Sequence, residues 1–345
     1  MEILIGLLII AVGSFGQSSS YVPIRKVKRW SWESFWLVQG IFAWLVFPFL
    51  GAQFALPGNV PLSEVWSAGS GGYGSLIYGI LWGVGGLTFG LSMRYLGVAL
   101  GQSIALGTCS AFGTLIPALL AGDDLFSGQG LILLLGVSIT LAGIATIGFA
   151  GSLRSKNMSK EAQMAAIKDF ALTKGLLVAL LAGVMSACFN LGLNAGEDIR
   201  LKTIALGANE LFALNPVIFL VTIGGFITNA SYCIFQNIRN KTAGDYFKVS
   251  PQVLVNNVLL CALAGMLWYS QFFGLGMGKS YFANAPVMQA FSWSILMALN
   301  VVFSNVWGII LKEWKGAGTK TIVVLVLGLL ILIFSTFFPR LMEQF

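Results

Sequence analysis

Ten stretches of this chain, each about twenty residues long, are almost entirely apolar. A helix of that length just spans the hydrocarbon of a bilayer and satisfies its own backbone hydrogen bonds there. Only 10% of the residues are charged, whereas soluble domains average about 25%. The sequence therefore predicts an all-α, polytopic membrane protein with ten transmembrane helices, near residues 3–21, 34–52, 74–93, 97–120, 130–150, 175–196, 211–236, 253–277, 287–311 and 321–338.

The positive charges are distributed unequally between alternate loops. Of the 20 Lys and Arg residues, all but Arg200, Lys202, Lys279 and Arg340 fall on one side of the predicted membrane. The positive-inside rule makes that side cytoplasmic and directs both termini outward. Because these charges are spread among short loops, the pI of about 9.3 reflects topology and does not indicate nucleic-acid binding.

The ten helices divide into five and five around a basic segment. Gly6-Leu7-Leu8 and Gly175-Leu176-Leu177 open the two halves, and Ser103-Ile104 recurs as Ser294-Ile295 in the second half. Since five is odd, two such repeats lie in opposite orientations, the inverted topology of secondary transporters. We expect a first repeat at 1–150, a cytoplasmic linker at 151–173 and a second repeat at 174–345, with a binding site between the repeats.

Polar side chains recur every three or four residues within several predicted spans, notably in helices 3–21 and 175–196. Such faces are turned away from lipid. Buried amides need partners, because an unpaired polar group costs about 1 to 3 kcal/mol. We therefore predict a substrate site formed by Gln17, Tyr21, Asn190, Asn194, Trp268, Gln271, Gln289, Trp293 and Asn300.

The residue types that catalysis requires are missing from the predicted membrane interior. The chain has no histidine, and no Asp or Glu lies in the middle of a predicted span. Neither a nucleophile with its base nor a carboxylate pair can then be assembled. We predict a protein that is not an enzyme, with no catalytic residues, no metal and no cofactor.

The same lack of fixed charge disfavours an ionic substrate. A neutral polyol fits better, because amides bind its hydroxyl groups while Trp or Tyr rings cover its apolar C–H face. The expected partners are a small neutral sugar, a coupling cation and the lipid bilayer. We expect function as a monomer.

Several segments carry a resemblance to one family. Residues 21–33 read YVPIRKVKRWSWE, and Met93-Arg94-Tyr95-Leu96-Gly97, Ser292-Trp293 and Leu311-Lys312-Glu313-Trp314 follow in the same order. The chain resembles, over nearly its whole length, the L-rhamnose/proton symporter family of the drug/metabolite transporter superfamily. The resemblance implies ten helices in two inverted repeats and uptake of a 6-deoxy sugar across the bacterial inner membrane by alternating access.

One departure from the family concerns the coupling ion. The proton-linked enterobacterial pattern has an acid three residues before Ser292-Trp293, where this chain has Gln289. An amide does not titrate in the physiological range, so another group must carry a coupled proton. Proton, sodium and uncoupled transport all stay open. The candidates for ion coupling are Ser18, Ser110, Thr114, Glu33 and Glu210.

Other functions also stay open. Other branches of the superfamily export amino acids or small metabolites, and a non-transporting membrane sensor would also have many helices. The loop at 56–74 reads as a flexible outward connection, and residues 156–174 as an interfacial amphipathic helix. The four cysteines lie within predicted spans and are expected to be buried free thiols.

Overall fold

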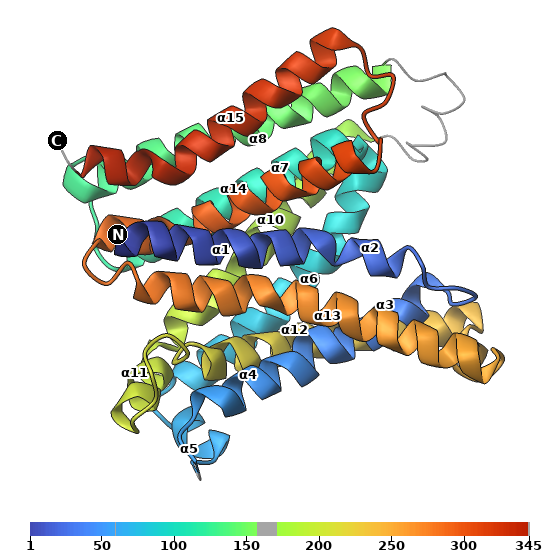
Figure 1. Cartoon of the computed structure of the whole chain (residues 1–345), viewed down its shortest axis with the longest axis horizontal. Helices are drawn as coiled ribbons and strands as arrows, with labels where there is room; N and C mark the ends of the chain where they lie inside the picture. The colour runs from blue at the N-terminus through green and yellow to red at the C-terminus, as the bar shows by residue number, and fades with distance from the viewer. Residues whose placement is uncertain (59, 157–170, 344–345) are drawn as a thin grey trace. The chain divides into compact units, whose positions relative to one another are not determined.

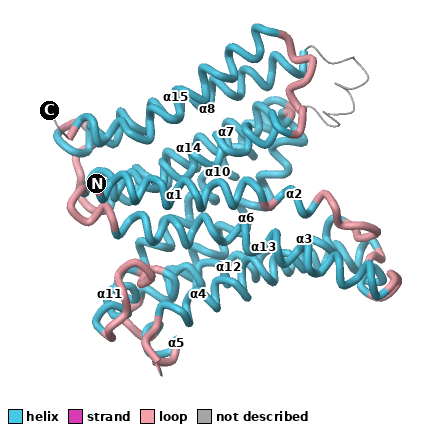
Figure 2. Tube along the Cα trace, viewed as in Figure 1, coloured by secondary structure: helices cyan, strands magenta, loops and turns pink. Residues whose placement is uncertain are grey.

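The computed structural model describes residues 1–58, 60–156 and 171–343. Helices make up its regular structure, and no strand occurs in the described residues (Figure 2). Within those residues ten helical spans are long and apolar enough to cross a membrane. This confirms the predicted all-α class, and the expected linker at 151–173 falls largely outside the described residues. The same is true of the expected amphipathic helix at 156–174.

The ten spans are built from the following elements: α1 (Glu2–Ser19) with α2 (Tyr21–Ile24); α3 (Trp32–Gly40), η1 (Ile41–Val46) and α4 (Phe47–Ala55); α6 (Gly71–Leu96); α7 (Val98–Leu120); α8 (Gly128–Lys156); α10 (Leu172–Ala195) with α11 (Glu197–Ala205); α12 (Asn215–Asn240); α13 (Pro251–Ser280); α14 (Pro286–Ile310); and α15 (Thr319–Met342). Two short helices, α5 (Leu62–Trp66) and η2 (Ala243–Tyr246), lie in loops.

The chain forms two compact units, and neither coincides with a sequence half. Unit 1 comprises Met1–Gly83 and Gly192–Tyr281, and unit 2 comprises Val84–Leu191 and Phe282–Phe345. Each unit therefore combines helices from both predicted repeats, and α6 and α10 each contribute residues to both units. Because a repeat is defined by its sequence and not by its packing partners, the division at 1–150 and 174–345 stays a prediction.

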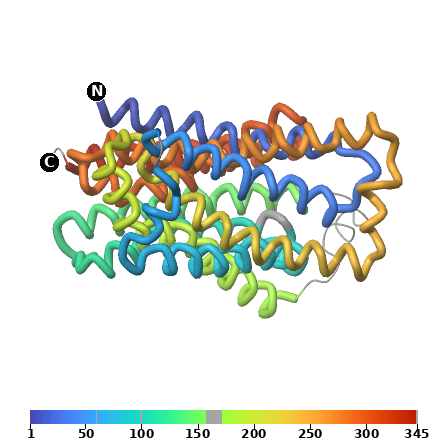
Figure 3. The backbone as a smooth tube through the Cα atoms, turned by 90° about the horizontal axis from the view of Figure 1, so that it is seen from below, coloured from blue at the N-terminus to red at the C-terminus, as the bar shows by residue number. Residues whose placement is uncertain are grey.

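In unit 1, α1 packs along α13 through small residues (Figures 1 and 3). Ser270, Gly274 and Gly278 lie at intervals of four on α13 and contact α1. The hydroxyl of Ser270 donates a hydrogen bond of 3.1 Å to the backbone oxygen of Gly13. Small residues let two helices approach closely, which is the usual basis of helix association in a bilayer.

The loop at 56–74 is more structured than the expected flexible connection. Its short helix α5 has Leu62 and Val65 buried, and the helix packs against α11 and α12. The indole nitrogen of Trp66 donates to the backbone oxygen of Pro216 at 3.1 Å. Proline and glycine correctly indicated a loop, but the spacing of Leu62, Val65 and Trp66 shows that this loop has an apolar side to bury.

In unit 2, α8 packs against α15 and α14 (Figure 1). Their shared core consists of Ile144, Ile147, Ala150, Ala298, Val301, Val302, Leu325 and Leu332. A Cβ atom on Gly143 or Gly328 would come within 2.6 Å of Leu332 or Ile147, so glycine sets the close approach of α8 and α15. All four cysteines are buried and free, as predicted.

Candidate substrate and ion sites

The second membrane span is irregular where its tryptophans gather. Between α3 and α4, residues Ile41–Val46 form a π-helix, which inserts an extra residue into a turn and is frequent at functional sites. The ring of Trp44 folds back over Gly40, where a Cβ atom would lie 2.6 Å from a ring carbon. Glycine at position 40 thus leaves the room that the Trp44 ring occupies.

Trp44 joins three elements of unit 1 through ring contacts. Its ring centroid lies 5.9 Å from that of Trp82 on α6 and 5.9 Å from that of Trp268 on α13, and Trp82 and Trp268 are 5.8 Å apart. Trp36 extends this tryptophan cluster at 5.9 Å from Trp44. Such rings offer large apolar faces with one polar N–H each, which suits a ligand that has both C–H and hydroxyl surfaces.

Among the polar atoms of unit 1 that are buried without a hydrogen-bond partner in the described part of the chain, three belong to fully buried residues. They are the indole nitrogen of Trp44, Oε1 of Gln39 and Oγ of Ser14, and these residues are 4%, 2% and 0% exposed. Buried polar groups are nearly always paired, so each such atom calls for an explanation. Together they offer a donor, an acceptor and a hydroxyl that can be either.

The predicted site residues of unit 1 have different surroundings. Gln271 is buried and donates from Nε2 to the backbone oxygen of Trp268 at 3.2 Å, one turn earlier on α13. Gln17 accepts a hydrogen bond of 3.3 Å from Ser18. Tyr21 is 51% exposed, and Asn194 is exposed near the end of α10. Of these, only Trp268 belongs to the tryptophan cluster, and the assignment of all of them to substrate binding stays a prediction.

In unit 2, a proline explains the position of one predicted residue. Pro117 lies inside α7 and has no N–H, so it cannot bond the backbone oxygen of Gly113 four residues earlier. Nδ2 of Asn190 on α10 donates to that oxygen at 2.7 Å. In a membrane, a backbone group freed by proline must be satisfied by a neighbouring helix, and Asn190 does this.

Two further candidates of unit 2 meet in a buried cluster of hydroxyl groups. The hydroxyl of Ser294 on α14 lies 2.8 Å from that of Ser110 and 2.9 Å from that of Thr114, both on α7. The indole of the adjacent Trp293 donates to the backbone oxygen of Cys109 at 3.2 Å and stacks on Phe189. Trp293 thus has a structural role in joining α14 to α7.

The remaining unit 2 candidates are Gln289 and Asn300. Both lie on α14 and are half-buried. The backbone oxygen of Gln289 accepts a hydrogen bond of 2.7 Å from Ser292. The role of both side chains in substrate binding stays a prediction.

Glu33 lies in a polar network at one end of unit 1. The residue is 7% exposed, and its Oε1 accepts hydrogen bonds from Nδ2 of Asn240 at 2.9 Å and from the hydroxyl of Thr242 at 2.8 Å. Both donors are uncharged. Glu33 lies in the first turn of α3, and most of its surface is shielded from solvent.

A second carboxylate, Asp245, holds the start of the same span. It accepts hydrogen bonds from the backbone N–H of Ser31 at 2.7 Å, the hydroxyl of Ser31 at 2.7 Å and the hydroxyl of Ser34 at 2.9 Å. Partial burial acts to raise the pKa of Asp245, but these hydrogen bonds and the charge of Lys248 outweigh it and lower the pKa below its usual range. Asp245 therefore stays ionised and clamps the η2 loop to α3.

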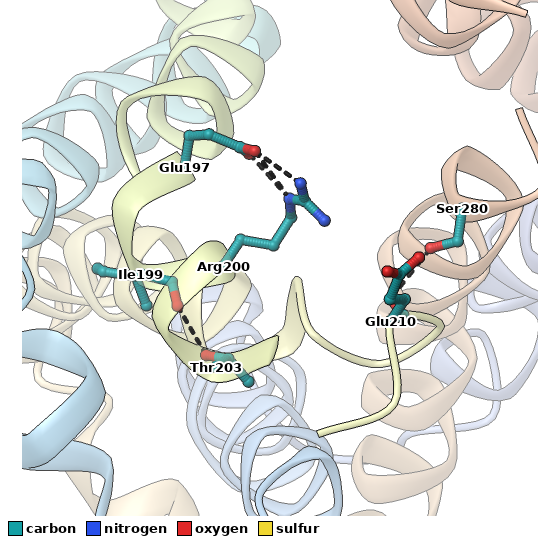
Figure 4. Close-up of polar contacts among 6 residues, drawn as sticks. All are labelled: Glu197, Ile199, Arg200, Thr203, Glu210 and Ser280. Atoms are coloured by element: carbon teal, nitrogen blue, oxygen red, sulfur yellow. Dashed lines mark hydrogen bonds and ion pairs between the residues drawn. The ribbon is translucent and has the colours of Figure 1, made fainter. Parts of the chain in front are cut away.

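Glu210 differs from Glu33 in that its side chain is exposed, in the turn before α12. Figure 4 shows the neighbourhood, where Ser280 donates to the backbone oxygen of Glu210 at 3.0 Å. Nearby, Arg200 forms an ion pair of 2.7 Å with Glu197 on the surface of α11. Glu210 thus contributes a backbone contact, and its carboxylate has the surroundings of an ordinary surface acid.

Comparison with known proteins assigns the family. The family model described as L-rhamnose-proton symport protein matches residues 1–341. The chain belongs to the L-rhamnose–proton symporter family. It is 33% identical over 348 residues to the L-rhamnose-proton symporter of Yersinia pestis (strain Pestoides F), with 96% of each chain covered. The corresponding protein of Yersinia pseudotuberculosis (strain YPIII) is also 33% identical, with the same coverage. Membership in the L-rhamnose–proton symporter family makes the chain a membrane transporter and not an enzyme.

The predicted site of this chain did not include Gln39, Trp44 or Ser14, whose buried polar atoms have no partner in the described residues. Gln39 and Gln53 are the amides of the second span, and Gln39 lies five residues before Trp44. That polar residue in an otherwise apolar stretch was a usable signal. The π-helix was not predictable, because its residues have no pattern that distinguishes it from an α-helix.

Proposed function

We propose that this chain takes up L-rhamnose or a related 6-deoxy sugar across the bacterial inner membrane by ion-coupled alternating access. The observation that carries the proposal is the match of the L-rhamnose-proton symport model over 1–341. The charge distribution among the loops supports outward termini. In an inverted-repeat carrier the substrate site is expected near the bilayer midplane, and the repeats move against each other around it.

The chemistry of the tryptophan cluster supports a sugar as substrate. The faces of Trp44, Trp82 and Trp268 match the apolar C–H and methyl surface of a 6-deoxy sugar. The unpaired N–H of Trp44 and the unpaired Oε1 of Gln39 match a hydroxyl acceptor and a hydroxyl donor. We add Gln39, Trp44 and Trp82 to the predicted candidates for substrate binding, which are Gln17, Tyr21, Asn190, Asn194, Trp268, Gln271, Gln289, Trp293 and Asn300.

We propose that the coupled ion is a proton and that Glu33 carries it. Gln289 cannot titrate, whereas Glu33 is a buried carboxylate whose two donors, Asn240 and Thr242, are neutral. A carboxylate that lacks a cationic partner can be neutralised by a proton at a lower cost than one in an ion pair. Glu210 is the weaker candidate because it is exposed.

Sodium is the second candidate for the coupled ion, and a cluster of hydroxyl groups in unit 2 supports it. The hydroxyl groups of Ser110 and Thr114 each lie within 3 Å of the hydroxyl of Ser294 in unit 2. Transporters commonly coordinate sodium with hydroxyl and backbone oxygens. These hydroxyl groups lie near Pro117, which lies inside α7 and cannot donate to the backbone oxygen of Gly113. Ser18 on α1 would be a separate contributor.

Uptake into proteoliposomes tests solute and ion together. Vesicles with an imposed proton gradient, a sodium gradient or neither are given radiolabelled L-rhamnose, and unlabelled L-rhamnose, L-fucose, L-lyxose or an amino acid is added as competitor. We expect uptake driven by the proton gradient and competition by L-rhamnose above the others. Competition by amino acids alone would indicate a metabolite exporter, and the absence of counterflow would indicate a sensor.

Single substitutions test the residues. Glu33→Gln is expected to abolish accumulation against a gradient while leaving counterflow intact, because counterflow needs no net proton movement. Asn194→Ala and Gln289→Ala are each expected to raise the KM for L-rhamnose. If both leave transport kinetics unchanged, the predicted location of the sugar is wrong.

A further inference from the structure

Unit 2 contains a cavity of about 260 Å³ between the start of α7, the end of α8 and the end of α14. Its floor is apolar and consists of core residues such as Ile144 and Val301. Its walls include Gln102, Asn305, Arg154, Glu313 and Trp314. None of these wall residues belongs to the sugar or ion sites proposed above, so the cavity calls for a separate ligand.

Among the described residues that line the cavity, the charged groups are one guanidinium and one carboxylate. Arg154 lies over the ring of Trp314, 5.5 Å from its centroid, a cation–π contact that orients the guanidinium. Glu313 precedes Trp314 in the chain and lines the same cavity. One positive and one negative charge complement a ligand that is itself zwitterionic, since a guanidinium binds phosphate and a carboxylate accepts from an ammonium group.

A second hollow lies beside the cavity on the surface of α7 and α8. This groove has a volume of about 430 Å³ and is lined mainly by apolar side chains, among them Leu100, Ile104, Leu141 and Phe149. Leu141 and Phe149 are exposed, as lipid-facing residues are. The groove and the cavity share two lining residues, Ser103 and Gly148, so a polar cavity and an apolar groove adjoin at one end of the same helix pair.

Only an amphipathic ligand fills both spaces. A zwitterionic amino acid would match Arg154 and Glu313 but would leave the groove empty. A bilayer supplies molecules with a charged headgroup joined to an acyl chain, and basic residues with an aromatic ring at the membrane interface are the usual headgroup partners.

We propose that the cavity and the groove together bind one phospholipid with a phosphoethanolamine headgroup. Its phosphate lies on Arg154, its ammonium group donates to Glu313, and one acyl chain lies in the groove along Leu100, Ile104 and Phe149. Phosphatidylcholine has the same net charge but a quaternary ammonium that cannot donate a hydrogen bond, so it fits the site less well.

The test measures lipid binding to the purified full-length protein in detergent, without sugar. Palmitoyl-oleoyl phosphatidylethanolamine, phosphatidylcholine and phosphatidylglycerol are titrated separately, with retained lipid counted by native mass spectrometry and the melting temperature recorded. We expect the phosphatidylethanolamine to bind about tenfold more tightly than the other two, which corresponds to one charge-assisted hydrogen bond. Equal binding of the three lipids would overturn the proposal.

Substitutions distinguish binding of the lipid headgroup from binding of the acyl chain. Arg154→Gln and Glu313→Gln are each expected to weaken the binding of phosphatidylethanolamine about tenfold. Glu313→Gln is also expected to remove the protein's preference for phosphatidylethanolamine over phosphatidylcholine. Ala145→Phe, at an exposed position in the groove, should weaken the full lipid but not soluble glycerophosphoethanolamine. Arg239→Gln removes an exposed charge at the end of α12 in unit 1 and is the matched control.

Two results would contradict the proposal even if one variant failed to fold. The first is wild-type lipid affinity in Ala145→Phe, because a surface residue is expected to leave folding intact. The second is loss of L-rhamnose binding in Arg154→Gln with lipid binding unchanged, which would assign the cavity to the sugar. Failure of the proposed sugar transport would leave the lipid measurement unaffected.

Discussion

Trp44 holds a buried N–H without a partner in the described part of the chain. Leaving such a group unpaired costs about 1 to 3 kcal/mol. Trp44→Phe keeps most of the ring and removes the N–H. If the N–H binds a sugar hydroxyl, the variant should bind L-rhamnose about tenfold more weakly, as loss of one hydrogen bond of ~1.4 kcal/mol requires. Its thermal stability without sugar should not fall, because no existing bond is broken.

The matched control is Trp66→Phe. The N–H of Trp66 already donates to the backbone oxygen of Pro216, so its loss should lower stability by about 1 kcal/mol and leave sugar affinity unchanged. Isothermal titration and melting curves of both variants give the comparison. Equal L-rhamnose affinity in Trp44→Phe and wild type would remove the assignment of Trp44.

The structure gives Asn190 a structural role beside its predicted role in substrate binding. Its amide satisfies the Gly113 oxygen that Pro117 leaves free. Asn190→Ala should therefore lower the free energy of unfolding by about 1 to 3 kcal/mol. Pro117→Ala restores an N–H for Gly113, so Asn190→Ala should cost about 1 kcal/mol less in that background, a coupling measured by a double-mutant cycle of melting curves. Strict additivity of the two changes would show that the bond carries no free energy.

These residues show how far a sequence alone reaches. The amide at position 190 stood out as a polar residue in an apolar span, but its partner is a backbone atom freed by a proline on a different helix. The sequence indicates that a buried amide needs a hydrogen-bond partner, but it does not indicate which atom that partner is. Ser110 and Thr114 were predicted as candidates for ion coupling, which stays a prediction. Their hydrogen-bond partner Ser294 was noticed only as part of an internal repeat.

Among the helices, the α1–α13 contact depends on small residues. A Cβ atom at Gly13 would lie 2.6 Å from the backbone oxygen of Ser270, which cannot rotate away. Gly13→Ala should therefore cost about 1 to 3 kcal/mol of stability through overpacking. Gly90→Ala on α6 is the control, because nothing lies within 4 Å of its Cβ. Alanine there should stabilise by about 0.5 to 1 kcal/mol through its helix propensity.

Melting temperatures of Gly13→Ala and Gly90→Ala should shift in opposite directions. If both rise, α1 and α13 are not in close contact in the membrane protein. The existence of these helices followed from hydropathy and length, since lipid leaves the backbone no alternative. Their pairing did not follow, because glycine and serine occur on many faces of many helices and only the folded structure shows which faces meet.

At the scale of the molecule, the predicted halves and the compact units are different divisions. Sequence order groups α1–α8 against α10–α15, whereas packing joins α1 to α13 and α8 to α15. Duplication acts on sequence, while burial acts on whichever apolar faces fit, so a repeat need not be a packing unit. The number of spans was predictable from the sequence, and the membership of the units was not.

The ionised side chain of Asp245 hydrogen-bonds residues of unit 1 that are distant in the sequence, so the stability of unit 1 should depend on pH. Asp245 holds Ser31 and Ser34, more than two hundred residues earlier, and these bonds lower its pKa in the folded protein. A lowered pKa means that the bonds stabilise the protein above the usual aspartate pKa of about 3.9, and that the stabilisation is lost as pH falls through the folded value.

Asp245→Asn should therefore be less stable than wild type at neutral pH, by about 1 kcal/mol, because an amide accepts these bonds more weakly than a carboxylate. The difference should shrink on acidification below the usual aspartate pKa of about 3.9, because the unfolded chain then takes up a proton, and the folded carboxylate loses its charge-assisted bonds at its lower pKa. Unfolding measured in detergent from neutral to acidic pH provides the test, with Asp124→Asn as control. Asp124 bonds only the adjacent Phe126 and Ser127 in an exposed turn, so its substitution should leave the stability of unit 1 unchanged. A wild-type curve parallel to that of Asp245→Asn throughout would mean that the charge of Asp245 does not contribute to stability.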